Sequence, residues 1–346
     1  MKLETFDDVL ASIKKNPSRK FHLLLGNGFS VAYDPLIFSY NALHDFVINL
    51  KDKDLSVILN VIETRNFEVI MQYLDSFAAL IDAFGGNPAL KKRVEAASAG
   101  LKASLLNAVK TLHPEHVFKV PEEQSKVCAN FLKGFLDTNG NIYSTNYDLL
   151  LYWVLMRNSV LNHIDGCGRE LDPGDELQIR SDLTWGKYRE KQNVFYLHGA
   201  LPFFDSGVAV VKEKYDVHNY LLQKISARMK NGEYPIFVTA GDGQQKLKHI
   251  THNQYLTYCY DSFCEAEGSL VTYGFSFGQY DEHIIDAINR AAKQGKKVPD
   301  KLWSIYISVY SNEDRKHVEK IVGKFRCKVH IYDAKTANIW GTKSDT

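Results

Sequence analysis

The most constraining stretch of the chain is Phe21–Ser30, in which an apolar run stops abruptly at a pair of glycines. The run Leu23–Leu25 has the continuous apolar character of a parallel strand buried on both faces, and Gly26-Asn27-Gly28 follows it directly. The pattern predicts a strand, a tight turn and then a helix or loop that begins near Ser30. Glycines let the backbone approach a bound group closely, and free N–H groups at such a turn suit phosphate. Val31 occupies the third position of the dinucleotide-binding fingerprint, where glycine or alanine is required, so the turn alone does not identify a nucleotide site.

The amino-acid composition argues against several classes of protein and of partner. The 346 residues include 42 basic and 41 acidic side chains, which gives no electrostatic reason to expect a nucleic acid or an anionic membrane as partner. No stretch approaches the ~18 consecutive apolar residues of a membrane span, and the N-terminus is typical of an amphipathic helix rather than a signal peptide. The five cysteines form no CxxC pair, which argues against a disulfide framework or a structural zinc site. We expect a cytoplasmic protein.

Strand-like and helix-like stretches alternate along most of the chain. After the first strand, the expected strands are 141–145, 194–197, 235–239, 269–273, 302–309 and 328–332, and the polar stretch 166–191 is expected to be a long excursion with short strands. The alternation predicts an α/β fold with a Rossmann-like, mostly parallel sheet flanked by helices.

A long helical stretch without a convincing strand interrupts this alternation at residues 36–137. We therefore expect a single domain over residues 1–346 that carries a helical insertion after the first βα turn. The helices expected in this stretch are Tyr40–Leu50, Leu55–Glu63, Phe67–Phe84, Ala89–Leu112 and Glu122–Leu136.

Four strand ends carry small or polar residues of the same kind. They are Gly26-Asn27-Gly28-Phe29-Ser30, Ser144-Thr145-Asn146-Tyr147-Asp148, Leu197-His198-Gly199 and Gly274-Phe275-Ser276, and the last is followed by Asp281-Glu282-His283-Ile284. Because ligands bind outside the carboxyl ends of the strands in sheets of this type, the convergence predicts a site at that edge.

The ordered series resembles the motifs of the sirtuin-like domain family, in the branch found as NAD-cleaving effectors of bacterial antiphage defence. The resemblance runs from about Phe21 to Ile285. It implies that the first glycine turn holds the pyrophosphate, that Gly274–Ser276 contacts the adenosine side, and that Asn146 and His198 are catalytic at the nicotinamide ribose. The residues that it implies at the bound dinucleotide are Gly26, Asn27, Gly28, Phe29, Ser30, Asp148, Gly274, Ser276, Asp281 and His283, the last two without an assigned contact.

The resemblance also sets the expected reaction. Sirtuin deacylases resemble the series too, but they carry a zinc module built on paired CxxC motifs, and this chain lacks those ligands. We therefore expect an NAD glycohydrolase that releases nicotinamide and ADP-ribose, with NAD as substrate and with no zinc or other metal. The asparagine side chain both donates and accepts, and a histidine with a pKa near neutrality suits removing a proton from water or a hydroxyl.

Each of these residues also has a purely structural interpretation. Asn146 and Asp148 fit a helix N-cap, His198 fits a strand-end histidine satisfied by the backbone, and Asp281 fits a helix first turn. The pair Lys246 and Lys248 is interpreted as a solvated charge cluster. Two other function classes remain open: a non-catalytic module that senses NAD or ADP-ribose, and a protein deacylase or ADP-ribosyltransferase.

Regulation is expected because depletion of NAD is toxic to the cell that makes the enzyme. We expect activation by a partner protein or by oligomerisation, with the helices within 40–136 as the interface. Neither a nucleic acid nor a membrane is expected as a direct partner.

Overall fold

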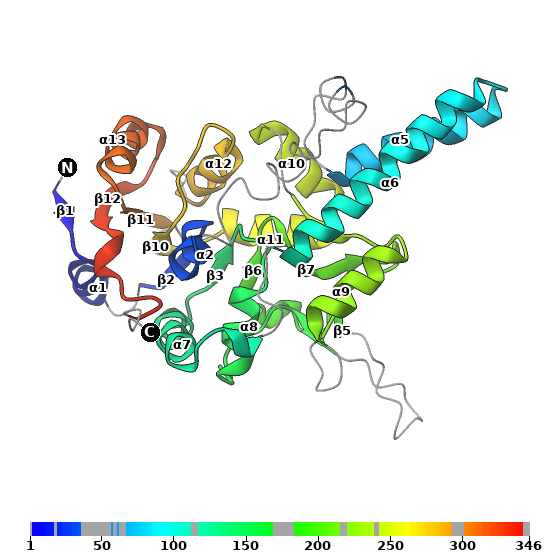
Figure 1. The fold of residues 1–346 in the computed structure, drawn as a ribbon. Helices are drawn as coiled ribbons and strands as arrows, with labels where there is room; N and C mark the ends of the chain where they lie inside the picture. Colours follow the sequence, from blue (N-terminus) through cyan, green and yellow to red (C-terminus); the bar gives the residue numbers. More distant parts are fainter. Residues whose placement is uncertain are drawn as a thin grey trace.

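The computed structural model describes residues 2–16, 19–35, 57, 61, 67–111, 117–168, 183–214, 220–238, 242–292 and 301–341. Apart from two isolated positions, the expected helices at 40–50 and 55–63 lie outside these residues. The expected α/β fold is confirmed, because a seven-stranded, all-parallel sheet lies between two layers of helices (Figure 1).

The order of the parallel strands is that of a Rossmann fold. The sheet reads β1–β12–β11–β10–β2–β3–β6. Its strands are β1 (Leu3–Glu4), β2 (Phe21–Leu25), β3 (Ile142–Ser144), β6 (Val194–Tyr196), β10 (Gly268–Tyr273), β11 (Leu302–Val309) and β12 (Lys328–Asp333). Numbered in chain order from β2, the strands from β6 to β12 read 3-2-1-4-5-6, which is the Rossmann order. The order reverses between β2 and β10, so the topological switch point lies at their carboxyl ends.

The helices bury their apolar faces against this sheet. One layer contains α1 (Phe6–Lys14), α7 (Glu122–Leu136) and α8 (Leu150–Arg157), and the other contains α11 (Gln254–Cys264), α12 (Glu282–Ala291) and α13 (Asn312–Ile321) (Figure 1). In the first layer, Phe135 of α7 contacts Phe21 of β2 with ring centroids 5.2 Å apart. In the second, Phe263 of α11 contacts Tyr143 of β3 at 4.7 Å.

A second sheet, antiparallel and five-stranded, was not expected from the sequence. Its order is β4–β5–β8–β7–β9, with β4 (Cys167–Gly168), β5 (Leu183–Trp185), β7 (Gly199–Asp205), β8 (Val210–Lys212) and β9 (Pro235–Phe237). The strand expected at 235–239 therefore forms, as β9, but outside the parallel sheet. Gly199 has φ +73° and follows His198 directly into β7, so no helix intervenes that would bring the chain back parallel.

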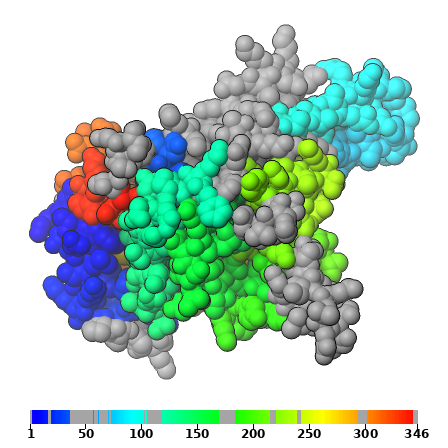
Figure 2. Space-filling model, turned by 60° about the horizontal axis from the view of Figure 1, so that its bottom comes forward, coloured from blue at the N-terminus to red at the C-terminus, as the bar shows by residue number. Residues whose placement is uncertain are grey.

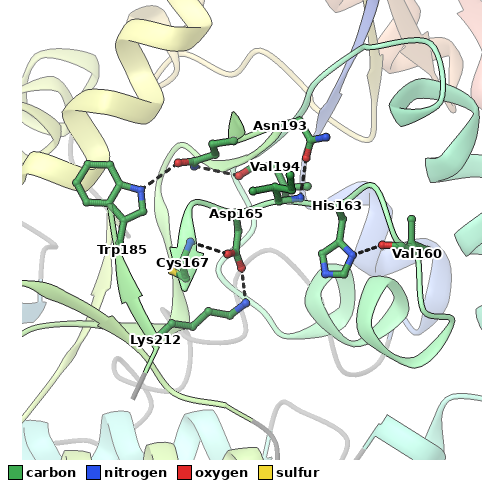
Figure 3. Close-up of polar contacts among 10 residues, drawn as sticks. Val160, His163, Asp165, Cys167, Trp185, Asn193, Val194 and Lys212 are labelled. Carbon is green, nitrogen blue, oxygen red and sulfur yellow. Dashed lines mark hydrogen bonds and ion pairs between the residues drawn. The ribbon is translucent and has the colours of Figure 1, made fainter. Parts of the chain in front are cut away.

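Buried polar groups join the second sheet to the first (Figure 3). The Trp185 indole of β5 donates to Gln192 Oε1 at 3.0 Å, and Gln192 Nε2 donates to the Val194 carbonyl of β6 at 3.1 Å. Beside them, Lys212 of β8 forms an ion pair with Asp165, whose carboxylate also accepts the Cys167 backbone N–H at 3.1 Å. The second sheet is thus fixed against the strand that ends at His198.

The helical hairpin of α5 (Phe67–Ala83) and α6 (Pro88–Thr111) projects from the rest of the molecule (Figures 1 and 2). By contrast α7, which was expected in the same insertion, packs on β2 and β3 and belongs to the helix layer. The remaining described α-helices are α2 (Gly28–Tyr33), α9 (Leu221–Lys230) and α10 (Gly243–His252). Among the described helices, none has both the length and the apolar character that crossing a membrane requires.

Candidate functional site

The four polar strand ends meet at one edge of the parallel sheet. They follow β10, β2, β3 and β6, which are consecutive neighbours in that sheet. The glycine turn after β2 and the Gly274 turn after β10 flank the switch point, and the Asn146 and His198 segments lie on the side of β3 and β6. The convergence predicted from the sequence is therefore present in the fold.

The glycines of the first turn are required by contact with the turn after β10. A Cβ on Gly26 would lie 2.5 Å from the Gly274 carbonyl oxygen, and a Cβ on Gly28 would lie 2.5 Å from the Gly274 Cα. Gly274 itself has φ +66°, a conformation that other residues rarely adopt. Two backbone turns thus touch at the switch point, and a side chain at any of these three positions would separate them.

The backbone N–H groups of Gly26 and Gly28 are not free to bind a ligand, because each already donates a hydrogen bond within the protein. The Gly26 N–H donates to the Tyr273 carbonyl at 3.0 Å, and the Gly28 N–H donates to the Gly274 carbonyl at 2.9 Å. The expectation of free glycine amides at this turn was therefore wrong for both residues. The reason is physical: the same close approach that demands glycine brings a carbonyl within reach of each N–H group.

Asn146 is the centre of a buried hydrogen-bond network. Its Nδ2 donates to the Gly26 carbonyl at 3.0 Å and to Ser30 Oγ at 3.1 Å. Ser30 Oγ donates in turn to Asp148 Oδ2 at 2.5 Å. Asn146 is 7% exposed and Ser30 is fully buried, so the network fixes the amide and orients it. Among the described residues, no group donates to Asn146 Oδ1, which leaves that oxygen available to a ligand.

Asp148 combines a capping contact with this network. Its Oδ1 accepts the Leu150 N–H, at the start of α8, at 2.9 Å, so the structural interpretation of Asp148 holds in part. Burial raises the pKa of the Asp148 carboxyl, and the hydrogen bonds from Ser30 and Leu150 partly offset this increase. Asn146, by contrast, caps no helix.

His198 and His283 form a buried pair. Their Nε2 atoms lie 2.8 Å apart, and their exposed fractions are 5% and 1%. Burial lowers the pKa of His198 well below its usual value, and the neighbouring His283, Lys246 and His249 side chains lower it further. Burial, followed by the charge of Lys246, lowers the pKa of His283 to about 3. Both shifts favour the neutral form of the rings.

Lys246 and Asp281 form an ion pair beside the two histidines. Lys246 Nζ lies 2.9 Å from Asp281 Oδ1, and both side chains are more than nine-tenths buried. Asp281 Oδ2 also accepts the Gly278 N–H at 3.2 Å, whereas the carboxylate makes no capping bond to α12. The interpretation of Lys246 as part of a solvated charge cluster was wrong, because it lies on the buried face of α10.

A comparison with known protein families assigns the chain to one family. Residues 23–340 match the family described as a domain of unknown function (DUF4917). The chain belongs to this family. The match includes all four strand-end motifs, the His198–His283 pair and the Lys246–Asp281 ion pair, so the whole site lies within the family's domain. No curated protein matches the chain.

Two of the residues implied by the resemblance lie away from the network. Phe29 is fully buried against Trp340, with ring centroids 5.0 Å apart, and its carbonyl accepts the Trp340 indole N–H. Ser276 is exposed. Asn27 and Gly28 are half-buried at the turn itself.

Sequence reasoning missed Lys246 and the contact between the two histidines. A signal for Lys246 was present, because Gly243, Lys246 and Ile250 recur at helical spacing and form the buried face of α10. The histidine contact had no local signal, since the two residues are separated by 85 positions in the chain.

Proposed function

We propose that this member of the DUF4917 family is an NAD glycohydrolase that converts NAD and water to nicotinamide and ADP-ribose. The observation that carries the proposal is the placement of Asn146 and His198, both buried, just after the carboxyl ends of β3 and β6, on the β2 side of the switch point of a sheet with Rossmann order. Dinucleotides bind at this point in folds of this type. The resemblance of the strand-end motifs to sirtuin-like NAD-cleaving domains supports the same substrate.

The chemistry requires little acid catalysis. The ring nitrogen of bound nicotinamide is cationic, so the base leaves readily, and the ribose passes through an oxocarbenium-like state. The Asn146 amide is held through Nδ2, so its Oδ1 is the atom that would accept a hydrogen bond from a ribose hydroxyl or the attacking water. The neutral His198–His283 pair supplies the base that removes the proton from water.

The donors for the dinucleotide phosphates differ from those of the sequence-based hypothesis. The amides of Gly26 and Gly28 are engaged and both residues contact the turn after β10, so they contribute by bringing the two turns together rather than by donating to phosphate. In the turn after β10, the exposed Ser276 hydroxyl is the group that we assign to the bound dinucleotide.

Activation is part of the proposal. The outward face of α5 carries an apolar stripe at helical spacing, formed by Tyr73, Phe77 and Leu80, with exposed fractions of 57%, 47% and 52%. Exposed apolar stripes of this kind mark interaction surfaces. We infer that the α5–α6 hairpin joins a second copy of the chain, or a partner protein, when the enzyme is switched on.

A second candidate function rests on a specific observation. The hydrogen bond between His198 and His283, together with the engaged glycine amides, also suits a site that binds NAD or ADP-ribose without turning it over. Calorimetry with NAD, combined with chromatography of the products, separates the two candidates. Binding followed by release of nicotinamide supports the hydrolase, and tight binding without product supports the sensing module. Release that requires an added acyl-peptide or target protein would contradict both and indicate a transferase or deacylase.

A further inference from the structure

The apolar stripe of α5 has the spacing of a helix-pairing surface. Phe84, which is 84% exposed, extends the stripe of Tyr73, Phe77 and Leu80 by one more turn, because its N–H donates to the Leu80 carbonyl at 3.0 Å. The four side chains are therefore separated by four, three and four residues. This is the alternation of the a and d positions of a coiled coil, in which one helix packs along another. The spacing indicates that the partner of this face is a helix.

The charged side chains of α5 lie on the other side of the helix and are bonded within the hairpin. Among the α5 side chains that the structure describes, only Asp75 and Asp82 are charged. Each lies two positions beyond a member of the stripe, which is about 200° around the helix. Asp75 accepts a hydrogen bond from Ser98 Oγ at 2.7 Å, and Asp82 forms an ion pair with Lys91, both on α6. These bonds occupy one face of the hairpin and leave the stripe on the opposite face.

The stripe matches a second copy of itself. Its spacing is the same in both directions, so in an antiparallel pair of α5 helices Tyr73 meets Phe84 of the second copy, and Phe77 meets Leu80 of the second copy. Such an interface is two-fold symmetric, because both copies contribute the same residues. The four side chains carry no charge, so like-charge repulsion between them does not oppose the meeting of two identical faces.

The shape of the molecule and the area of the stripe set the kind of pairing. The hairpin projects from the rest of the molecule, so antiparallel pairing places the two bodies at opposite ends of the paired helices (Figure 1). A large aromatic side chain buries about 150–250 Å², so four side chains that are about half exposed bury roughly 400 Å² per copy. A stable interface of standard size buries about 800 Å² per partner. The pairing is therefore weak and depends on protein concentration.

We propose that two copies of this chain associate through the apolar stripe of α5, as an antiparallel and two-fold symmetric pair of helices. The partner in the activation step is then a second copy of the chain rather than a different protein. The role of the pairing in activation rests on the proposed function, whereas the pairing itself does not.

The first test asks whether one stripe meets another. Phe77→Glu/Leu80→Glu and Phe77→Lys/Leu80→Lys should each be monomeric in sedimentation velocity, and their equimolar mixture should form dimers that weaken as salt is added. Leu161→Glu/Val208→Glu, which replaces two exposed apolar side chains outside the hairpin, is the matched control and should associate like the wild type. A wild type that stays monomeric at every concentration, or a mixture that does not associate, would overturn the inference.

The second test determines the direction of the pairing with Phe77→Lys/Leu80→Glu. In the antiparallel pair each introduced charge lies beside one of opposite sign, so this variant should associate without a second protein. In a parallel pair like charges would meet, and a monomeric variant with the circular dichroism of the wild type would overturn the antiparallel arrangement. Neither test uses NAD, so a lack of nicotinamide release would contradict the proposed function and leave the pairing in place.

Discussion

His22 shows how a single buried side chain makes the stability of this fold depend on pH. It lies in β2, where Nδ1 accepts the Asn141 N–H at 2.9 Å and Nε2 donates to the Glu267 carbonyl at 2.8 Å. These two bonds require the neutral ring, and burial lowers the pKa of His22 to about 4. Nothing in the local sequence indicated this role, since both partners are more than 100 positions away.

The first prediction follows from that pKa. The unfolded value is 6.5, so between pH 6.5 and pH 4 the unfolded chain binds more protons, and the free energy of unfolding decreases as the pH falls. His22 should account for about 3 kcal/mol of that loss by pH 4, at about 1.4 kcal/mol per unit. Urea denaturation of His22→Gln at pH 7 and pH 4.5 should show a smaller loss than the wild type. The exposed His252→Gln variant should behave like the wild type, and equal pH dependence for all three proteins would refute the assignment.

At the scale of elements, the contact between the turns after β2 and β10 determines which glycines are indispensable. The sequence located the first turn correctly, and six of the seven strands of the parallel sheet formed close to where their apolar runs indicated, the exception being β1, which was not expected. It could not show that the group approaching Gly26 and Gly28 is another turn of the same chain, because that turn lies about 250 residues away.

The second prediction compares two glycines. Gly28→Ala places a Cβ 2.5 Å from the Gly274 backbone, which has no flexible side chain to move aside. We expect a loss of about 1–3 kcal/mol in the free energy of unfolding. Gly134→Ala, on the exposed face of α7, meets no atom within 4 Å and should gain roughly 0.5–1 kcal/mol. Chemical denaturation of the two variants measures both, and a Gly28→Ala variant as stable as the wild type would contradict the turn contact.

The second sheet marks the limit of sequence reasoning at this scale. Its strands are mostly three residues or shorter, so they carry no usable periodicity, and their pairings join distant segments. Gly199 shows why the chain leaves the parallel sheet: it has φ +73°, and a Cβ there would lie 2.0 Å from the Ile236 carbonyl oxygen. The pair His198-Gly199 indicated the end of a strand, but it could not show that the chain then enters the antiparallel sheet.

At the scale of the whole molecule, the projecting α5–α6 hairpin is the feature that the fold itself does not explain. Its outward apolar stripe covers nothing among the described residues, and the hairpin projects from the rest of the molecule (Figures 1 and 2). The helical insertion was predicted from the sequence, and the exposure of this face could be known only from the packing of the two helices.

The third prediction concerns assembly. We expect the wild-type protein to self-associate as its concentration rises, because association buries Phe77 and Leu80 together with the rest of the stripe. A Phe77→Glu/Leu80→Glu variant should remain monomeric in sedimentation velocity and keep its fold, since both side chains are exposed. Identical sedimentation of the variant and the wild type across the concentration range would exclude the hairpin as the self-association surface.

The residues of the candidate site could be predicted from the sequence, whereas the contacts between their side chains could not. The order of the four strand ends was readable in the chain, so Asn146 and His198 were candidates before the structure was known. The network around Asn146 and the pairing of His198 with His283 depend on side chains from separate elements, which no local pattern specifies.

The most direct test of the account is nicotinamide release from NAD by the wild-type protein, Asn146→Ala and His198→Ala, measured by chromatography with and without candidate partner proteins. Asn130→Ala and His252→Ala, which replace exposed residues of the same types, are the controls. We predict release by the wild type and the controls, and a loss of about 100-fold or more in both site variants. Undiminished release from either site variant, or no release from the wild type under any condition, would contradict the proposed activity.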